Sequence, residues 1–538
     1  MKYEYRNPIL SGFYPDPSVC RAGDTFYLVN STFAYFPGLP VFQSKDLLNW
    51  KQIGNAIDRP GQLCYDDHDI SQGLFAPTIR YNKGVFYIVC TLIKNGGNFI
   101  ITAKDPAGPW SDPVWLKGVD GIDPSVFFDE DGKTWYCGTH PAPEGEKYNG
   151  NYEIFIQEMD MEKLSKGENP LKGEQTGIWR GAMKDVIWPE GPHIYKIGSW
   201  YYCLHAEGGT GIDHAVCIAR AKEIKGTWEG KKSNPVVTHR HMGRRSKIIN
   251  VGHGDLVDDT EGGWWIILLA SRQFEGVCPL GRETFIIPVF WENGWPFIAT
   301  ESGLIEDGLP APDPSSQNDF NVSYSLNSCE YFNEELKTEY KGKLPFHWMV
   351  LRMPADEKKC AFSLSARPDA LRLFTVKNTI REKEHPAFAG RRIRHKDWGF
   401  TVSMDFIPKT EFESAGICIL QNEKYHYRFE RCLSSGKKGQ LRVIKAAGEF
   451  DEIIVIKEFP ESDAHVSLTA ICEDMQLSFF LIKPDGTMDK IAHELDARIL
   501  STEYAGGFVG SLAGVYACGN GKDSNNHADI LWADYRGI

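Results

Sequence analysis

The sequence predicts an all-β protein, a five-bladed β-propeller followed by a C-terminal β-sandwich of the jelly-roll or lectin-like type. Three observations lead to this fold class. A sequence motif long enough for two strands, called the phrase below, recurs five times between residues 16 and 268. A second series of short alternating segments follows a linker, and helical periodicity is nearly absent. Alternation of apolar and polar residues is the signal of half-buried strands. The 30 Phe, 22 Tyr and 15 Trp residues also suit a β-rich fold.

Each copy of the phrase reads as a β-hairpin. It has an anchor residue, an apolar run, a turn rich in Gly, Asn or Asp, and an aromatic pair that opens a second run. The copies are DPSVCRAGDTFYLV, APTIRYNKGVFYIV, DPSVFFDEDGKTWYCG, EGPHIYKIGSWYYCL and HGDLVDDTEGGWWIIL, which begin at Asp16, Ala76, Asp123, Glu190 and His253. The anchors are 60, 47, 67 and 63 residues apart, enough for about four short strands in each unit. The repeat therefore predicts a five-bladed propeller domain over residues 1–307.

A change in composition marks a second domain. Residues 308–319, GLPAPDPSSQND, are rich in turn-forming residues and predict a linker. Beyond them, segments such as LRLFTV, FTVSMDFI, YHYRFER and LSFFLI have the alternation and the β-branched and aromatic residues of strands. They predict an antiparallel sandwich over residues 320–538.

Charge, hydropathy and cysteine content exclude several classes of partner. The formal net charge of −13 argues against nucleic acid and anionic membrane surfaces, which recruit basic patches. The longest apolar run, WWIILLA, is far shorter than the ~20 residues of a membrane span, and MKYEYRNPILSG contains no apolar signal segment. Thirteen cysteines without the clustered spacing of a zinc site indicate reduced core thiols. We therefore expect a cytoplasmic protein without nucleic-acid or membrane partners, and homo-oligomerisation stays open.

Three of the five anchors are acidic. Asp16, Asp123 and Glu190 occupy the same position of the repeat, so in a propeller they would face one another at one mouth of the central channel. Crowded carboxylates repel, so at least one should keep its proton near neutral pH. One acid and one base are what cleavage of a glycosidic bond requires. Ala76 holds the same position in the second copy, so structure alone does not require an acid there.

Other interpretations of these anchors stay open. The two aspartates could be turn caps and Glu190 a rim residue, since Asp-Pro-Ser also occurs at Asp313 in the linker. A propeller with a sandwich could also be a catalytically silent lectin or a protein-interaction scaffold. Binding alone does not need a protonated acid beside a carboxylate, and no kelch or WD signature occurs, so an enzyme is favoured.

The stretches NPILSGFYPDPSV, GIDPSVFFDEDGK, PEGPHIYK, AEGGT and CPLGRET resemble glycoside hydrolase family 43. The likeness is to its two-domain β-xylosidase and α-L-arabinofuranosidase members and extends over both domains. The resemblance implies an inverting mechanism, in which Asp16 corresponds to the general base and Glu190 to the general acid. Asp123 corresponds to a third carboxylate that tunes the pKa of the acid and orients the sugar. Trp188 and Pro189 precede Glu190, and this apolar flank would help to keep it protonated.

The resemblance also implies two further polar residues in the pocket. Arg282, in CPLGRET, resembles the substrate-contacting arginine of the family, and its guanidinium could hydrogen-bond sugar hydroxyls and hold Asp123 ionised. His253, in VGHGD, resembles a histidine of the central channel, where some members bind a calcium ion or an ordered water. A satisfied core histidine is the alternative. The chemistry itself requires no cofactor.

Aromatic residues are expected around the substrate. Phe33, Phe36 and Phe75 lie in loops that would wall the pocket. In the resembled enzymes the sandwich lends a loop to the pocket entrance, and the glycine-rich GGFVGSLAG at Phe508 is the candidate. A channel blocked in this way would favour exo-action on small oligosaccharides.

The resemblance therefore implies release of xylose or arabinose from the non-reducing ends of short arabinoxylo-oligosaccharides. We expect a β-D-xylosidase, with an α-L-arabinofuranosidase or a dual-specificity enzyme as the alternative. The loops FAYFPG, GLFAPT and VIWPEGP depart from the clearest β-xylosidases, which commonly have tryptophan in the first two and threonine before the acid. These departures leave the three carboxylates intact and place the sugar specificity in question.

Overall fold

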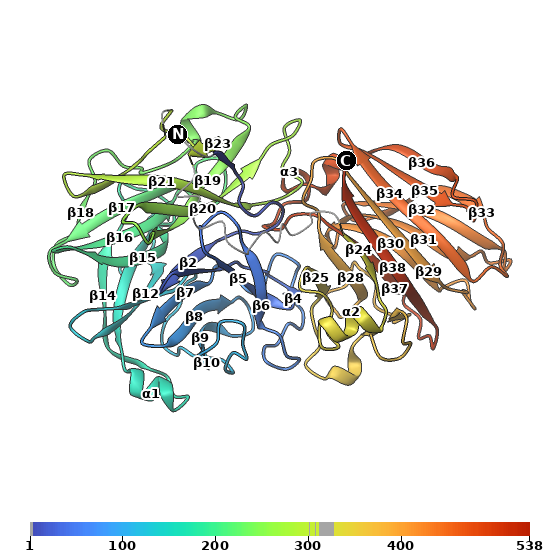
Figure 1. Cartoon of the computed structure of the whole chain (residues 1–538), viewed down its shortest axis with the longest axis horizontal. Coiled ribbons are helices and arrows are strands. Elements are labelled where there is room, and N and C mark those ends of the chain that lie inside the picture. Colours follow the sequence, from blue (N-terminus) through green and yellow to red (C-terminus); the bar gives the residue numbers. More distant parts are fainter. Residues whose placement is uncertain (1–3, 301, 307, 311–327) are drawn as a thin grey trace.

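The computed structural model describes residues 4–300, 302–306, 308–310 and 328–538 (Figure 1). Strands dominate both halves. The α-helices in the described ranges are the short α1 (Met161–Ser165), α2 (Glu334–Glu339) and α3 (Thr502–Ala505), and the 3-10 turns are η1 (Arg240–Met242), η3 (Glu357–Lys359) and η4 (Ala497–Leu500). None of the helices found there has the length and apolar character needed to cross a bilayer.

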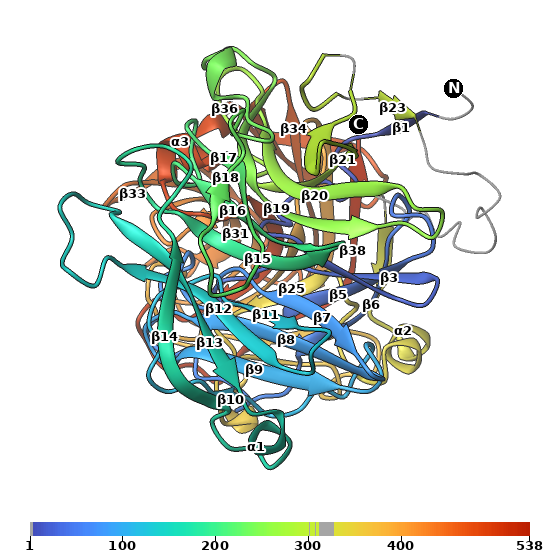
Figure 2. The same cartoon turned by 90° about the vertical axis from the view of Figure 1, so that its left-hand side faces the viewer.

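Five four-stranded antiparallel sheets build the first domain within the described part of the chain, and they confirm the predicted propeller (Figure 2). Blade one consists of β2 (Ser18–Ala22), β3 (Thr25–Val29), β5 (Gly38–Ser44) and β6 (Lys51–Ile57). Blade two consists of β7 (Thr78–Asn82), β8 (Val85–Leu92), β9 (Gly97–Ala103) and β10 (Val114–Trp115). Blade three consists of β11 (Ser125–Phe128), β12 (Thr134–Pro141), β13 (Tyr152–Met159) and β14 (Leu171–Trp179).

The last two blades follow the same order. Blade four consists of β15 (Glu190–Ile197), β16 (Trp200–Glu207), β17 (Ala215–Ala221) and β18 (Glu229–Gly230). Blade five consists of β19 (Ile248–Asp258), β20 (Trp264–Arg272), β21 (Glu283–Glu292) and β22 (Trp295–Ile298). In every blade the recurring hairpin supplies the first two strands of the sheet. Four anchors therefore stand at or just before the start of their blade and His253 stands within β19, which brings residues far apart in sequence around one axis.

A buried ion-pair network joins the first strands of four blades. Arg80 of β7 donates to Asp255 of β19 (Nη1 to Oδ2, 2.8 Å), and Ser18 of β2 donates to the same carboxylate (2.7 Å). The Tyr195 hydroxyl of β15 also donates to Asp255. Burial alone would raise the pKa of Asp255, but the Arg80 guanidinium lowers it overall. Because each blade supplies one partner, the network ties the inner strands together.

The chain ends of the propeller meet. The short strand β1 (Glu4–Arg6) pairs antiparallel with β23 (Gly308–Pro310). The Asn7 side chain also bonds the backbone of Ile286, donating to its oxygen at 2.9 Å and accepting from its nitrogen at 3.0 Å. Residues 308–310, expected to open the linker, thus form a strand. The remainder of the predicted linker, 311–319, lies outside the described residues.

Two eight-stranded antiparallel sheets face each other in the second half of the chain and confirm the predicted sandwich. The first contains β26 (Phe362–Ser363), β27 (Leu371–Phe374), β38 (His527–Gly537), β29 (Trp398–Asp405), β34 (His465–Glu473), β35 (Gln476–Ile482) and β36 (Met488–Asp496), with β24 (Ser328–Tyr331) paired to β38. The second runs in the order β33 (Asp451–Glu458), β32 (Gly439–Ala447), β31 (Tyr425–Leu433), β30 (Ser414–Asn422), β37 (Leu512–Cys518), β28 (Ala387–Arg392), β25 (Trp348–Leu351) and β4 (Tyr35–Phe36).

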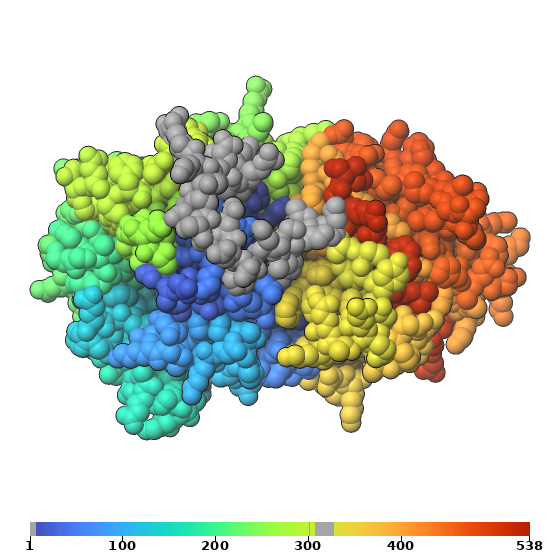
Figure 3. Space-filling model, in the orientation of Figure 1, coloured from blue at the N-terminus to red at the C-terminus, as the bar shows by residue number. Residues whose placement is uncertain are grey.

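The edge strand β4 belongs to the propeller half of the chain. Its backbone pairs with β25, Tyr35 opposite Leu351 and Phe36 opposite Val350, so the two domains share one sheet. In the space-filling view the segment that opens the sandwich, in yellow, abuts the blue first blades (Figure 3). The shared sheet fixes how the sandwich sits against the propeller, and this decides which sandwich residues reach the channel mouth.

Candidate active site

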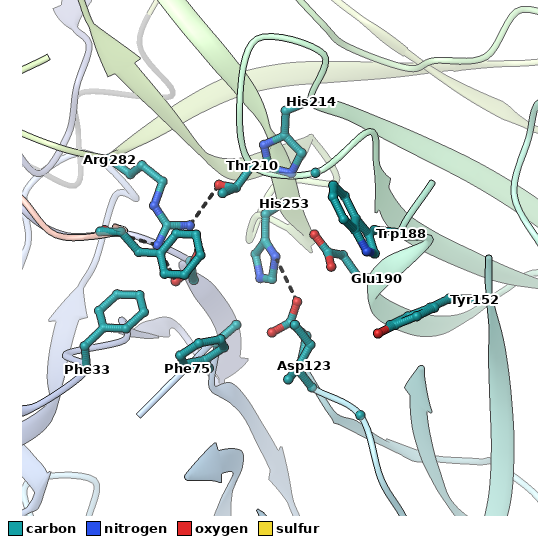
Figure 4. A pocket seen from close by; sticks show the side chains of 16 residues that line it. Phe33, Phe75, Asp123, Tyr152, Trp188, Glu190, Thr210, His214, His253 and Arg282 are labelled. Atoms are coloured by element: carbon teal, nitrogen blue, oxygen red, sulfur yellow. Dashed lines mark hydrogen bonds and ion pairs between the residues drawn. The ribbon is translucent and has the colours of Figure 1, made fainter. Parts of the chain in front are cut away.

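A pocket of about 330 Å³ opens where the blades begin, and every blade contributes to its lining (Figure 4). Its wall includes the predicted residues Asp16, Phe33, Phe75, Asp123, Glu190, His253, Arg282 and Phe508. Ala76, the non-acidic anchor, also lines it. The five anchors of the repeat thus surround one cavity, as the sequence predicts for a propeller axis.

The backbone aims the two aspartates into the cavity. Asp16 and Asp123 have φ values of 51° and 54°, in the left-handed region, and each precedes a proline. Residues before proline ordinarily adopt extended conformations, so both positions are strained. Glu190 reaches the cavity differently: it is the first residue of β15, and a bulge follows at Gly191, where φ is 57°. Strain held by the surrounding structure at two of three convergent acids is typical of a functional site.

Asp16 forms a buried ion pair with Arg282. The distance between Arg282 Nη1 and Asp16 Oδ1 is 2.8 Å, and Ser31 Oγ donates to the other carboxylate oxygen. The guanidinium and the hydroxyl group thus supply a hydrogen-bond donor to each carboxylate oxygen. The prediction that Arg282 holds Asp123 ionised was wrong, because the side chain extends to Asp16 instead and the pKa of Asp123 is raised.

Glu190 and Asp123 are buried acids whose pKa values are both raised. Burial, followed by the Asp16 carboxylate, raises the pKa of Glu190 to about 7, although Arg282 opposes this shift. Burial also raises the pKa of Asp123 well above its usual value, with the carboxylates of Glu190 and Asp16 adding to it. The two acids together therefore keep a proton near neutral pH, in the same pocket as the ion pair of Asp16 with Arg282. One base and one protonated acid coexist in this cavity.

Three phenylalanines form one wall, and the sandwich supplies one of them. The Phe33 ring lies 5.3 Å from Phe75 and 6.0 Å from Phe508, between centroids. The Arg282 guanidinium carbon lies 5.6 Å from the Phe33 ring and 5.5 Å from the Phe508 ring. Two cation–π contacts and the Phe508 carbonyl, which accepts from Nη2 at 3.3 Å, thus hold Arg282 against Asp16.

Phe36 does not line the pocket, contrary to the prediction. Its backbone pairs with Val350 in β25, and its ring packs edge-on against Tyr65, 6.4 Å between centroids. Joining the strand of the neighbouring domain turns this side chain into the core between the domains. The FAYFPG motif therefore contributes Phe33 to the site and Phe36 to the interface.

The opposite wall holds residues that the sequence did not single out as ligands, Trp188 and Tyr152 (Figure 4). Glycines clamp the Trp188 indole, because a Cβ added at Gly150 or at Gly209 would lie 2.7 Å from its ring atoms. Trp188 itself has a φ of 48°. The paired glycines of AEGGT were the available signal, since close packing of a large ring requires glycine.

Thr210 and His214 complete the pocket and were also missed. Thr210 Oγ1 accepts a hydrogen bond from Arg282 Nη1 at 2.9 Å. His214 Nδ1 lies 3.1 Å from the Asn250 carbonyl oxygen, and burial lowers the pKa of His214 to about 3, so the ring stays neutral. Both follow the glycine pair of AEGGT, and Thr210 reinforces the position of the arginine.

His253 has few of the ligands that a calcium ion needs. Its Nδ1 lies 3.9 Å from Asp123 Oδ2, and burial lowers its pKa. Calcium takes six to eight oxygen ligands, which one imidazole and one carboxylate do not supply. In the described part of the chain, three potential metal ligands gather at His205, Glu207 and Cys217, away from this pocket. The residues present do not fit a calcium site, and no step below depends on one.

Family models match both domains. The model described as glycosyl hydrolases family 43 matches residues 5–296, and the model described as the beta xylosidase C-terminal concanavalin A-like domain matches residues 338–536.

Whole-length relatives agree with the two models. The chain is 42% identical over 533 residues to a protein named xylosidase/arabinosidase from Butyrivibrio fibrisolvens, covering 98% of each. It is 35% identical to the non-reducing end alpha-L-arabinofuranosidase BoGH43B of Bacteroides ovatus, covering 99% of this chain and 94% of that one. The crystal structure of a xylan beta-1,4-xylosidase from Bacillus halodurans superposes with a TM-score of 0.89 at 28% identity, covering 99% of this chain and all of the other. With two domains, a three-carboxylate pocket and these likenesses in agreement, the chain belongs to glycosyl hydrolases family 43.

Proposed function

We propose that the protein is an exo-acting, inverting glycoside hydrolase that releases xylose or arabinose from the non-reducing ends of short arabinoxylo-oligosaccharides. A β-D-xylosidase is the first reading, and an α-L-arabinofuranosidase or a dual-specificity enzyme is the alternative. The observation that carries the proposal is the pocket itself: Asp16 is ion-paired with Arg282, while the pKa values of Glu190 and Asp123 are raised so that they keep a proton nearby.

The proposed reaction uses these groups in one displacement. Asp16 takes a proton from a water molecule, whose oxygen attacks the anomeric carbon. Glu190 gives its proton to the glycosidic oxygen, so the leaving sugar departs neutral and the anomeric configuration inverts. Asp123, whose own pKa is raised by burial and by the Glu190 carboxylate, is proposed to orient the sugar. Proton transfer by carboxyl groups needs no cofactor.

The shape of the site favours exo-action. The blades and the Phe508 loop of the sandwich together line a cavity of about 330 Å³, which has room for a terminal sugar but not for a polymer passing through. Phe33, Phe75 and Phe508 offer ring faces near Asp16 and Arg282, where a terminal sugar can stack. Trp188 and Tyr152, beyond Glu190 in Figure 4, are placed to contact the leaving part of the chain.

The names of two relatives leave two candidate sugars, xylose and arabinose. One is named xylosidase/arabinosidase and the other alpha-L-arabinofuranosidase, so both activities occur among similar chains. The test compares an aryl β-D-xylopyranoside with an aryl α-L-arabinofuranoside under identical conditions. A preference of tenfold or more for the xyloside supports the first reading, and the reverse preference supports the alternative. Cleavage of neither would contradict the proposal and favour a sugar-binding protein.

We further propose that the protein works in the cytoplasm on imported oligosaccharides. All thirteen cysteines are free thiols and most are buried, which suits a reducing compartment. Cell fractionation tests this location. Self-association is a separate proposal, to be tested by light scattering of the purified protein, with a mass of 60.7 kDa expected for the monomer.

A further inference from the structure

A second pocket, of about 410 Å³, lies in the sandwich domain and shares no residue with the active site. We call it the sandwich pocket. It is lined by Thr379, Ile380, Arg381, Glu411, Phe412, His426, Arg428, Arg442, Ile444, Asp451, Ile453 and Asn520. Its floor is formed by β31, β32 and β33, which lie at the end of their sheet remote from the propeller strand β4 (Figure 1).

Alternation along the strands explains why polar residues gather there. On β31, Tyr427 and Phe429 point between the sheets into the core, so His426 and Arg428 point to the outer face. Near the active site, the same outer face carries Leu420, which packs with propeller residues. Past β30 the propeller no longer covers this face, and the sandwich pocket opens in its place.

A buried acceptor in the pocket lacks a partner. His426 is fully buried, and its Nδ1 lies 3.3 Å from the Asn422 carbonyl oxygen, so Nδ1 carries the hydrogen and Nε2 is an acceptor. Nε2 has no hydrogen-bond partner among the described residues, and neither has the buried Arg428 Nε donor. An acceptor and a donor left open on one pocket floor match hydroxyl groups, which both donate and accept.

The charges of the pocket favour a neutral ligand. Asp451 accepts from Arg381 Nε at 2.6 Å and from Arg428, and Glu430 accepts from Arg442. Each of the three arginines therefore has a carboxylate partner, Asp451 in the pocket lining or Glu430 behind it, and an added anion would meet Asp451. Beside these polar groups, the half-exposed Phe412 ring stands at the rim with 40% of its surface accessible. An apolar ring face next to paired donors and acceptors is how proteins hold sugars.

We infer that the sandwich pocket is an accessory binding site for a neutral oligosaccharide, with Phe412 stacking on one sugar and His426 accepting from its hydroxyl. The choice of a xylo-oligosaccharide as occupant rests on the proposed function. Such a site would hold a second part of the substrate, or a second molecule, on the enzyme without taking part in cleavage.

The test titrates xylotriose into the full chain carrying Glu190→Gln, which prevents turnover. Calorimetry reports all binding, whereas tryptophan fluorescence reports the active site, because Trp188 lines that pocket and the sandwich pocket has no tryptophan in its lining. We expect two binding events by calorimetry and one by fluorescence. Phe412→Ala should weaken the fluorescence-silent event about tenfold or more. His426→Phe, which removes the acceptor while keeping a ring, should do the same.

Phe450→Ala is the matched control, since Phe450 is 85% exposed on the same domain and does not line the pocket. It should leave both events unchanged, and Phe412→Ala should leave aryl glycoside hydrolysis unchanged. A single binding event, or a second event indifferent to Phe412→Ala, would overturn the inference. Displacement of xylotriose by glucuronate or inorganic phosphate would overturn the choice of a neutral ligand. Loss of aryl glycoside activity in the parent would count against the proposed function alone, because the binding comparison does not depend on turnover.

Discussion

At the scale of single residues, opposite environments separate three similar carboxyl groups. Asp16 is next to a guanidinium, whereas Glu190 and Asp123 are next to each other and to apolar surface. A carboxylate that gains a cation stays ionised, and a buried one that gains another carboxylate keeps a proton. The division into base and acid is therefore set by position in the pocket and not by residue type.

Glu190→Gln tests the acid. Hydrolysis of xylobiose should fall by about 10²–10⁴-fold, since a poor leaving group needs protonation. An aryl glycoside with an acidic phenol leaving group should lose far less, because the phenolate departs without a proton. Steady-state kinetics with both substrates distinguishes the two cases. Equal loss with both substrates would assign Glu190 another role.

The pH dependence follows from the same residue. The pKa of Glu190 is raised to about 7, so the protonated acid disappears as the pH rises through that value. We expect kcat/KM for xylobiose to decline above about pH 7, and the decline to be weaker with the activated aryl glycoside. A pH profile flat to pH 9 with xylobiose would contradict the shifted pKa.

The raised pKa also has a cost in stability. The folded protein binds this proton more tightly than the unfolded chain, so the contribution of Glu190 to the unfolding free energy falls between about pH 4.5 and 7. Glu190→Gln, which cannot ionise, should therefore be more stable than the parent at pH 8, and the difference should vanish near pH 4. Denaturant titrations of both proteins at pH 4 and pH 8 measure this difference in unfolding free energy. An equal stability of the two proteins at pH 8 would contradict the raised pKa.

At the scale of elements, short loops between strands position the substrate-facing side chains. Gly209, in the loop after β16, has a φ of 70° and leaves room for the Trp188 ring. Gly211, two residues on, has nothing within 4 Å of an added Cβ. A side chain at position 209 would therefore clash with Trp188, whereas one at position 211 would meet open space.

Gly209→Ala should displace Trp188, since its Cβ would lie 2.7 Å from ring atom Cε3. We expect a stability loss of about 1–2 kcal/mol and a clear rise in KM for xylo-oligosaccharides. Gly211→Ala is the matched control and should behave as the parent. Thermal melts and kinetics measure both, and an unchanged KM in Gly209→Ala would show that Trp188 does not contact substrate.

At the scale of the whole molecule, Arg352 is one of several arginines that join the domains. Arg352 follows β25 and is fully buried, and its Nη1 donates to the His68 carbonyl of the propeller and to Glu423 of the sandwich, at 2.9 and 2.7 Å. Glu423 in turn accepts from the Ile70 amide at 2.8 Å. Because β4 also crosses between domains, we expect propeller and sandwich to unfold as one unit.

Arg352→Ala should weaken the contact between the domains, so that the propeller and the sandwich unfold in separate transitions. It leaves Glu423 without its buried cation, at a cost of about 3–5 kcal/mol. Calorimetry should show one transition in the parent and two in the variant, and activity should fall because Phe508 leaves the pocket. Arg498→Ala, which removes a surface pair with Asp496, should change stability by less than about 1 kcal/mol. A single, unshifted transition in Arg352→Ala would contradict the coupling.

Local pattern determined much of this protein. Each hairpin forms from residues within about 16 positions, so strand alternation and turn residues sufficed to predict the blades, the sandwich and the convergence of Asp16, Asp123 and Glu190. The repeat also predicted which residues face one another, because residues at equal positions of a propeller repeat surround the same axis.

Only the tertiary structure decided which residues contact one another in and around the pocket. Arg282 pairs with Asp16 across 266 residues, Phe508 reaches the pocket from the other domain, and Phe36 leaves it because β4 joins the sandwich sheet. None of these contacts leaves a periodic signal, since each depends on how two finished sheets pack and not on the local chain. The sequence by itself therefore determined which acids meet, whereas tertiary packing decided which of them pairs with Arg282 and which aromatic wall the sugar would touch.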